Sequence, residues 1–166
     1  MEPPSEEHDM RQAVRLSGWV LLLVVLLGVA GCGSRRTVTV YVQPNGLPVL
    51  YDYDDAVDHA RREDRLLLVH FTSPTCAYCI EFMNIVLPDP GLEAISHAYV
   101  EARLRPEYSD DADDVFEDLN DGVRNLPQVI VVDPRTGAKL ATSKGPDLDV
   151  AAFAAFLESA ARAANR

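Results

Sequence analysis

Two cysteines separated by two residues, Cys76 and Cys79, are the part of this sequence whose residue types and spacing most directly suggest chemistry. Such a pair supplies half of a zinc site, forms a structural disulfide, or acts as a redox couple that makes and breaks its own bond. A structural zinc site needs four Cys or His ligands, usually from two clustered pairs. The chain has no second CxxC, and His59, His70 and His97 stand singly. A purely structural disulfide across two residues closes a very small loop and restrains little of the unfolded chain, so the redox couple is favoured.

The residues around the pair predict a strand before it and a helix after it. The continuous apolar run 66–71, LLLVHF, is typical of a strand buried on both faces, and residues 76–87 have a helical pattern that two prolines end. Cys76 would then begin a helix, where unpaired N–H groups and the helix dipole stabilise a thiolate, the species that attacks a disulfide. Cys79 lies one turn further and is placed to attack back and resolve a mixed disulfide.

The remaining patterns predict an α/β fold, with a mixed central β-sheet and helices on both faces. Turns are expected at Asn45–Gly46 and Pro134–Gly137, and Asp147 is the expected N-cap of the last helix. We expect further strands at 37–42, 99–104, 128–133 and 138–143, and further helices at 54–65, 92–98, 112–122 and 147–164.

Two stretches, LLLVHFTSPTCAYCIEFM (66–83) and NLPQVIVVDPRTGAKL (125–140), resemble the thioredoxin superfamily. They are most similar to its short periplasmic members, which are related to the thioredoxin-like domain of disulfide-reducing transporters. The similarity spans about residues 50–164. It implies a thioredoxin-like fold and thiol–disulfide exchange with protein thiols and disulfides. It also implies an upstream redox donor, and no cofactor or metal beside the redox-active disulfide itself.

The resemblance also implies roles for individual residues. Cys76 is the attacking thiol and Cys79 the resolving thiol. Pro127 matches the family's cis-proline, whose loop lies against the sulfurs and presents its backbone to an extended substrate, so the Leu126–Pro127 bond is expected to be cis. The alternative is an ordinary trans proline before a strand. Tyr78, inside the pair, is expected to be exposed beside the thiols, where its ring can contact substrate.

Several positions depart from the thioredoxin pattern. Thr75 replaces the Trp before the first cysteine, and we assign it to the substrate-binding rim. His70 replaces a buried acid that assists proton transfer in thioredoxins. We favour a satisfied interior histidine here, and the alternative is that its neutral ring takes a proton near physiological pH. Glu81 lies close to a position that is commonly basic, and an acid there should raise the pKa of the thiols.

The direction of electron flow does not follow from the resemblance. The dipeptide Ala77–Tyr78 replaces Gly-Pro, and reduction potentials across these families span about 150 mV. A reductase is our expectation. A disulfide oxidase or isomerase, or a non-catalytic thioredoxin-fold binding or chaperone module, is the alternative.

The N-terminus predicts export and lipid anchoring. The apolar run 19–30 fits the core of a signal peptide, and VAGC at 29–32 resembles a bacterial lipobox, in which Cys32 is lipidated. A start at Met10 would give this signal a basic beginning. We therefore expect a signal peptide at 1–31, a lipidated N-terminus and linker at 32–49, and a thioredoxin-like domain at 50–166, on the extracytoplasmic face of a bacterial cell envelope. The alternative is an uncleaved anchor with an unmodified cysteine.

Composition narrows the class of partner. The chain of 166 residues has a formal net charge of -11, which argues against nucleic-acid binding because that needs clustered Lys and Arg. Eight acids between residues 107 and 121 predict a solvated acidic face, which can steer basic partners.

Overall fold

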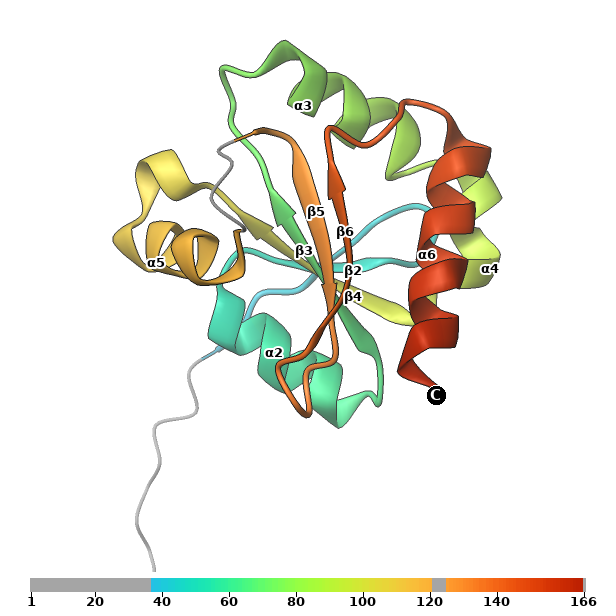
Figure 1. Ribbon diagram of the computed structural model, residues 1–166, viewed down its shortest axis with the longest axis horizontal. Coiled ribbons are helices and arrows are strands. Elements are labelled where there is room, and N and C mark those ends of the chain that lie inside the picture. Colours follow the sequence, from blue (N-terminus) through green and yellow to red (C-terminus); the bar gives the residue numbers. More distant parts are fainter. Residues whose placement is uncertain (1–36, 121–124, 166) are drawn as a thin grey trace, which may run out of the picture. The chain divides into compact units, whose positions relative to one another are not determined.

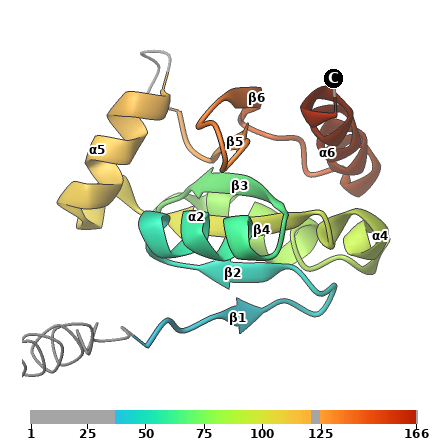
Figure 2. The same cartoon turned by 90° about the horizontal axis from the view of Figure 1, so that it is seen from below.

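A six-stranded mixed sheet forms the centre of the computed structural model, which describes residues 37–120 and 125–165. The strand order is β1-β2-β4-β3-β5-β6, and Figure 2 shows the strands stacked in this order. β2, β4 and β3 are parallel, while β1, β5 and β6 run antiparallel to their neighbours. The predicted mixed sheet is thus confirmed. The bounds are β1 Tyr41–Val42, β2 Pro48–Leu50, β3 Leu66–Phe71, β4 Tyr99–Leu104, β5 Gln128–Val132 and β6 Lys139–Lys144.

Helices cover both faces of the sheet, as predicted (Figure 1). On one face lie α2 (Tyr53–Arg62) and α5 (Asp110–Leu119), whose buried residues pack with one side of β3, β4 and β5. The other face holds α3 (Ala77–Glu81), the π-helix η1 (Phe82–Val86), α4 (Glu93–Ser96) and α6 (Val150–Ala164). Two short 3-10 turns, η2 (Pro90–Leu92) and η3 (Pro106–Tyr108), complete the structure.

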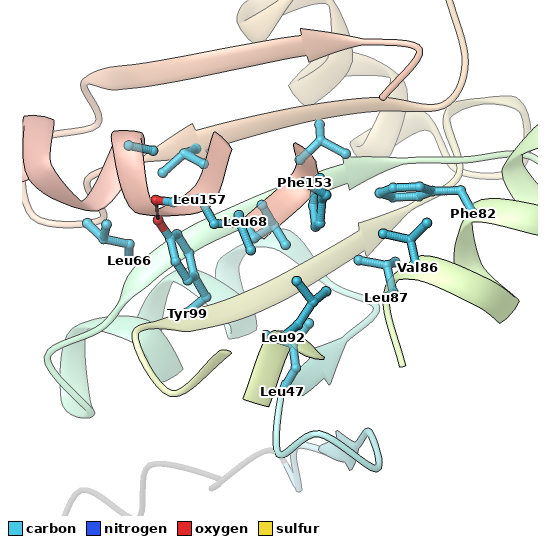
Figure 3. Close-up of a cluster of buried hydrophobic side chains, with 13 residues drawn as sticks. Leu47, Leu66, Leu68, Phe82, Val86, Leu87, Leu92, Tyr99, Phe153 and Leu157 are labelled. Atoms are coloured by element: carbon cyan, nitrogen blue, oxygen red, sulfur yellow. Dashed lines mark hydrogen bonds between the residues drawn. The ribbon is translucent and has the colours of Figure 1, made fainter. Parts of the chain in front are cut away.

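β3 lies between β4 and β5 in the middle of the sheet, and every one of its side chains is buried. Leu67, Val69 and Phe71 join the core under α2 and α5, whereas Leu66 and Leu68 join the core under α6 (Figure 3). Alternation along a strand therefore points the remaining residue of β3, His70, toward α3 and η1. This confirms the sequence-based prediction of a strand buried on both faces.

The helix after the cysteines differs from the continuous helix predicted at 76–87. It begins as α3 and changes into η1 at Phe82, where the Leu87 N–H donates to the Phe82 carbonyl at 3.1 Å. A π-turn needs more residues than an α-turn. Phe82 and Val86, four residues apart, share a face in any α-helix, and the wider turn also brings Leu87 onto this buried face.

Element ends also differ from the predictions. β1 covers two residues instead of 37–42, and β2 was not predicted because its three residues have no alternation to reveal them. The predicted cap Asp147 is wrong. Asp149 caps α6 by accepting from the Ala151 and Ala152 N–H groups at 2.8 and 3.1 Å, and Asp147 instead accepts from the Asp149 N–H at 3.2 Å.

The two other long helices are shifted as well. α2 ends at Arg62 because Asp64 adopts a positive φ of 53°, which no α-helix continues. α5 begins at Asp110, capped by the Ser109 hydroxyl, and ends at Leu119 instead of spanning 112–122.

Candidate functional site

Cys76 and Cys79 form a disulfide between the end of β3 and the start of α3. Their Cα atoms are 5.2 Å apart. The two sulfurs are in different surroundings, because Cys79 is fully buried while Cys76 is partly exposed. The predicted order of strand, cysteine pair and helix is confirmed.

Cys76 is the N-cap residue of α3. Its Sγ accepts a hydrogen bond from the Cys79 N–H at 3.1 Å, and its carbonyl accepts from the Ile80 N–H at 3.1 Å. A backbone N–H aimed at sulfur stabilises a thiolate more than a neutral thiol. In the reduced protein this contact therefore favours Cys76 as the nucleophile.

The loop before β5 lies against the disulfide. The Leu126–Pro127 peptide bond is cis, as predicted, and Cys76 Sγ lies 3.8 Å from the Leu126 carbonyl oxygen. Pro127 is buried, and its carbonyl accepts a hydrogen bond from the Gly145 N–H at 2.9 Å. The loop therefore connects the disulfide to the segment between β6 and α6.

Tyr78 links the CxxC turn to the same segment. The residue is 39% exposed, which agrees with the predicted exposure, but its hydroxyl donates to the Pro146 carbonyl at 2.9 Å. Tyr78 is thus partly exposed beside the cysteines in the chain, with its hydroxyl already hydrogen-bonded.

Thr75 is exposed and belongs to a small polar network at the other side of the CxxC turn. Its hydroxyl lies 3.0 Å from the Ser73 hydroxyl, which donates to Glu107 Oε2 at 2.7 Å. Ser73 is buried. Through it, the acidic segment that begins at η3 is attached directly to the turn before Cys76.

His70 is fully buried, but it is not the satisfied interior histidine that we favoured, because only one of its ring nitrogens has a partner among the residues that the structure describes. Its Nδ1 lies 2.9 Å from Glu101 Oε1, while its Nε2 has no hydrogen-bond partner among residues 37–120 and 125–165. Glu101 is also buried. It accepts from Arg103 Nε and Nη2 at 2.7 and 2.8 Å and from Gln43 Nε2 at 3.1 Å.

This network keeps Glu101 ionised. Burial alone raises the pKa of the Glu101 carboxyl, but the hydrogen bond from His70 and the Arg103 guanidinium outweigh it and lower the pKa to about 2. A buried carboxylate is stable here because four nitrogen atoms surround its two oxygens.

Sequence reasoning did not identify the residues that support the site: Glu101, Arg103, Gln43, Ser73, Glu107, Gly145 and Pro146. One signal was available. Glu101 lies in the strand YVEARL on the same side as Tyr99, two residues before it. A charged side chain on a buried strand indicates an ion-pair or hydrogen-bond partner. The contacts of Ser73 and of Pro146 join segments 34 and 68 residues apart, and no local pattern reveals such pairs.

Two further predictions concern the N-terminal signal and metal binding. Cys32, Met10 and the rest of the predicted signal lie outside the described residues. In the described part of the chain, no helix combines the length and hydrophobicity needed to cross a membrane. Residues 37–120 and 125–165 also contain no group of three or more His, Cys, Asp or Glu side chains arranged to hold a metal ion.

Solved structures with the same fold are thioredoxins and Dsb-type proteins. A thioredoxin from Thermus thermophilus is 24% identical, with a TM-score of 0.59, over 69% of this chain and 87% of that one. DsbH oxidoreductase is 16% identical, with a TM-score of 0.56, over 81% and 96%. The oxidised C-terminal domain of Neisseria meningitidis DsbD is 15% identical, with a TM-score of 0.52, over 63% and 89%. No curated protein sequence matches the chain significantly.

The family model described as Thioredoxin-like domain matches residues 53–161, more than half of the chain. The match includes the disulfide, the cis-proline loop and the buried His70. The predicted superfamily is thereby confirmed, and the chain belongs to the thioredoxin-like domain family.

Proposed function

We propose that this protein is a thiol–disulfide oxidoreductase that exchanges disulfides with protein substrates, and that it works as a reductase. The observation that carries the proposal is the inequality of the two sulfurs. Cys76 is partly exposed and lies 3.8 Å from the Leu126 carbonyl in the cis-proline loop, while Cys79 is fully buried behind it. An incoming protein therefore meets one sulfur first, which is the arrangement that ordered exchange requires.

The reaction proceeds in two exchanges. The Cys76 thiolate attacks one sulfur of the substrate disulfide, so a mixed disulfide forms and the first substrate thiolate leaves. Cys79 then loses its proton to His70 and attacks the Cys76 sulfur, which releases the second substrate thiolate. The protein loses two electrons and becomes the Cys76–Cys79 disulfide, and the substrate disulfide becomes two thiols. An upstream redox donor returns the protein to the dithiol form.

The substrate-binding rim is formed by Thr75, Tyr78 and the Leu126–Pro127 loop. Leu126 is partly buried and Pro127 buried, so these two residues present mainly backbone. Tyr78 lies between the two cysteines in the chain and Thr75 directly before Cys76, and both are exposed. Together they suit an extended polypeptide that brings its disulfide across Cys76.

Acidic residues near the pair support the reducing direction. A strong oxidant of this class has a stabilised reduced form, because its attacking thiolate is stabilised. Here Glu81 follows the pair, and Glu107 contacts the turn before it through Ser73. Negative charge disfavours the thiolate and hence the reduced form, which makes the couple a better reductant. We expect a reduction potential closer to that of thioredoxin, about −270 mV, than to about −120 mV.

Changing Cys79 to Ala tests the catalytic proposal. The reduced C79A variant should accumulate mixed disulfides with a disulfide-bonded protein such as insulin, and reducing agent should release them. A C76A/C79A variant is the matched control and should trap nothing. If folded C79A forms no adduct, the exchange activity is refuted and a non-catalytic binding module becomes the better explanation.

Equilibration of the wild-type couple with glutathione redox buffers tests the direction. A potential well above that of the glutathione pool would contradict the reductase and favour an oxidase or isomerase.

We also propose that the chain is lipid-anchored through Cys32 on the extracytoplasmic face of a bacterial envelope. The support is the sequence VAGC after the apolar run 19–30. Expression in a bacterial host with labelled fatty acid should give a labelled protein, and the C32A variant should be unlabelled. Label retained in C32A would contradict this assignment.

A further inference from the structure

A buried ionic cluster lies beneath the CxxC turn, on the face of the sheet that α3 and η1 cover. Its centre is Glu101 on β4, which is fully buried and accepts from Arg103, Gln43 and His70. An ionised carboxylate accepts hydrogen bonds and donates none. The ring nitrogen of His70 that faces it, Nδ1, must therefore carry a proton.

The state of Nδ1 determines that of the opposite nitrogen. When His70 is neutral and Nδ1 carries the proton, Nε2 has a free lone pair. That atom is inaccessible to solvent and has no partner within residues 37–120 and 125–165. Buried polar atoms are nearly always hydrogen-bonded, so an orphaned ring nitrogen close to a redox disulfide requires an explanation.

The ring lies against the helix that carries Cys79. His70 packs edge-on against Phe82, with ring centroids 5.5 Å apart and an interplanar angle of 77°. Thr72, just beyond the end of β3, contacts Met83, with Oγ1 3.7 Å from Sδ. Phe82 and Met83 follow Cys79 by one helical turn, and residues three and four apart share a helix face. The buried side of the helix that contains Cys79 therefore faces the side of the sheet that holds the His70 ring.

We propose that Glu101 is a positioning residue of the exchange reaction, which holds His70 so that Nε2 receives the proton of the Cys79 thiol. The inference rests on the proposed function and deepens it. In the disulfide form Cys79 has no proton to give, which explains the orphaned nitrogen. In the mixed disulfide the Cys79 S–H bond breaks, the proton bonds to Nε2, and the sulfur's electron pair attacks Cys76. The departing substrate thiolate takes the proton from the imidazolium.

Glu101 supplies the negative charge that stabilises the His70 imidazolium. The groups that face the ring from the neighbouring strands and helix are Phe82 from η1, Val129 from β5, and Arg103 with Glu101 from β4. Phe82 and Val129 are apolar, and Arg103 is itself a cation. Without the Glu101 charge, a protonated His70 would be buried beside a positive guanidinium, which is strongly unfavourable.

The variant that isolates the charge is Glu101→Gln, because Gln keeps the size and an acceptor for Nδ1–H but has no negative charge. The reduced protein is mixed in a stopped-flow instrument with an aryl disulfide whose thiolate absorbs visible light. Attack by Cys76 releases the first thiolate, and attack by Cys79 releases the second. The exposed Glu158→Gln on α6 is the charge-matched control.

We expect Glu101→Gln to slow the second release at least about tenfold, within the range of general acid–base effects. The first release should stay within about twofold of wild type, since Cys76 does not depend on His70. The pH midpoint of the second release should rise by about one unit, the equivalent of a tenfold loss of thiolate. Glu158→Gln should resemble wild type in both releases.

Equal slowing of both releases, or an unchanged pH midpoint in a folded variant, would overturn the inference and leave Glu101 a structural role. If Glu101→Gln does not fold, nitrogen NMR of His70 in the wild-type disulfide form decides. Protonated Nδ1 with bare Nε2 is expected, and the opposite tautomer contradicts the proposal. A wild-type protein that releases no second thiolate would instead refute the proposed function itself.

Discussion

At the scale of single residues, the difference between Cys76 and Cys79 comes from position alone. Both are cysteines of one short turn, yet one is the partly exposed N-cap and the other is fully buried one turn later. The acid after them, Glu81, is exposed at the end of α3. Its charge acts on the thiols through solvent, so its effect should be modest.

Replacing Glu81 by Gln should lower the pKa of Cys76 in the reduced protein by about half a unit, because a nearby negative charge disfavours the thiolate. The pH dependence of alkylation by iodoacetamide measures this pKa. The same substitution at the distant, exposed Glu158 should leave it unchanged. An unchanged or higher Cys76 pKa in Glu81→Gln would show that Glu81 does not act on the pair.

At the scale of elements, three segments meet around the disulfide and are held by two hydrogen bonds. The Tyr78 hydroxyl connects α3 to the Pro146 carbonyl, and the Gly145 N–H connects the same segment to the carbonyl of the cis-proline. Gly145 has a φ of +67°, a conformation that favours glycine. Nothing lies within 4 Å of an added Cβ there, so a side chain at this position would meet no steric clash. It would be disfavoured only by the positive φ.

Replacing Tyr78 by Phe should lower the free energy of unfolding by about 1 kcal/mol, the typical net contribution of one hydrogen bond. The ring remains, so substrate contacts through it should persist. Urea denaturation of the disulfide form measures the change. The control is Tyr108→Phe, since Tyr108 is 62% exposed and should be nearly neutral. Equal losses in the two variants would mean that the Tyr78–Pro146 bond does not hold the segment.

At the scale of the whole molecule, the sheet separates two apolar cores and carries a buried ionic cluster within one of them. Under α6, Phe153 meets Phe82 edge-on at 5.0 Å, and the Tyr99 hydroxyl donates to the Leu157 carbonyl at 2.6 Å (Figure 3). The helix that carries the disulfide is thereby fixed to α6. Because Glu101 is ionised inside this core, stability must depend on pH.

The wild-type protein should lose stability as the pH falls from about 5 toward 2. The pKa of Glu101 is about 2 in the folded state and 4.5 when the carboxyl has no such interactions. Its contribution to the free energy of unfolding is therefore complete above pH 4.5 and disappears as the pH approaches 2. The loss should be on the order of 3 kcal/mol. Chemical denaturation across this range should show the slope in wild type and a flatter curve in Glu101→Gln. Parallel curves would contradict the assignment.

Much of the fold and part of the site could be predicted from local patterns. The run LLLVHF predicted the buried strand, and the CxxC after it predicted the disulfide turn. Pro127 matches the family's cis-proline and predicted the cis bond. The end of α2, the break at η1 and the capping of α6 were missed. These helix ends and the break depend on which residues reach the core and on which acid accepts from the first N–H groups of the helix. Strand alternation and helical periodicity do not reveal either.

The sequence by itself determined the chemistry, because the nature of the reactive group and its strand–turn–helix setting are local properties of residues 66–87. Only the tertiary structure decided the surroundings of that group. Glu101 reaches His70 across 31 residues, Ser73 reaches Glu107 across 34, and Tyr78 reaches Pro146 across 68. Hydrogen bonds between distant segments form only when packing brings the segments together, so these surroundings of the disulfide could not be read from local patterns.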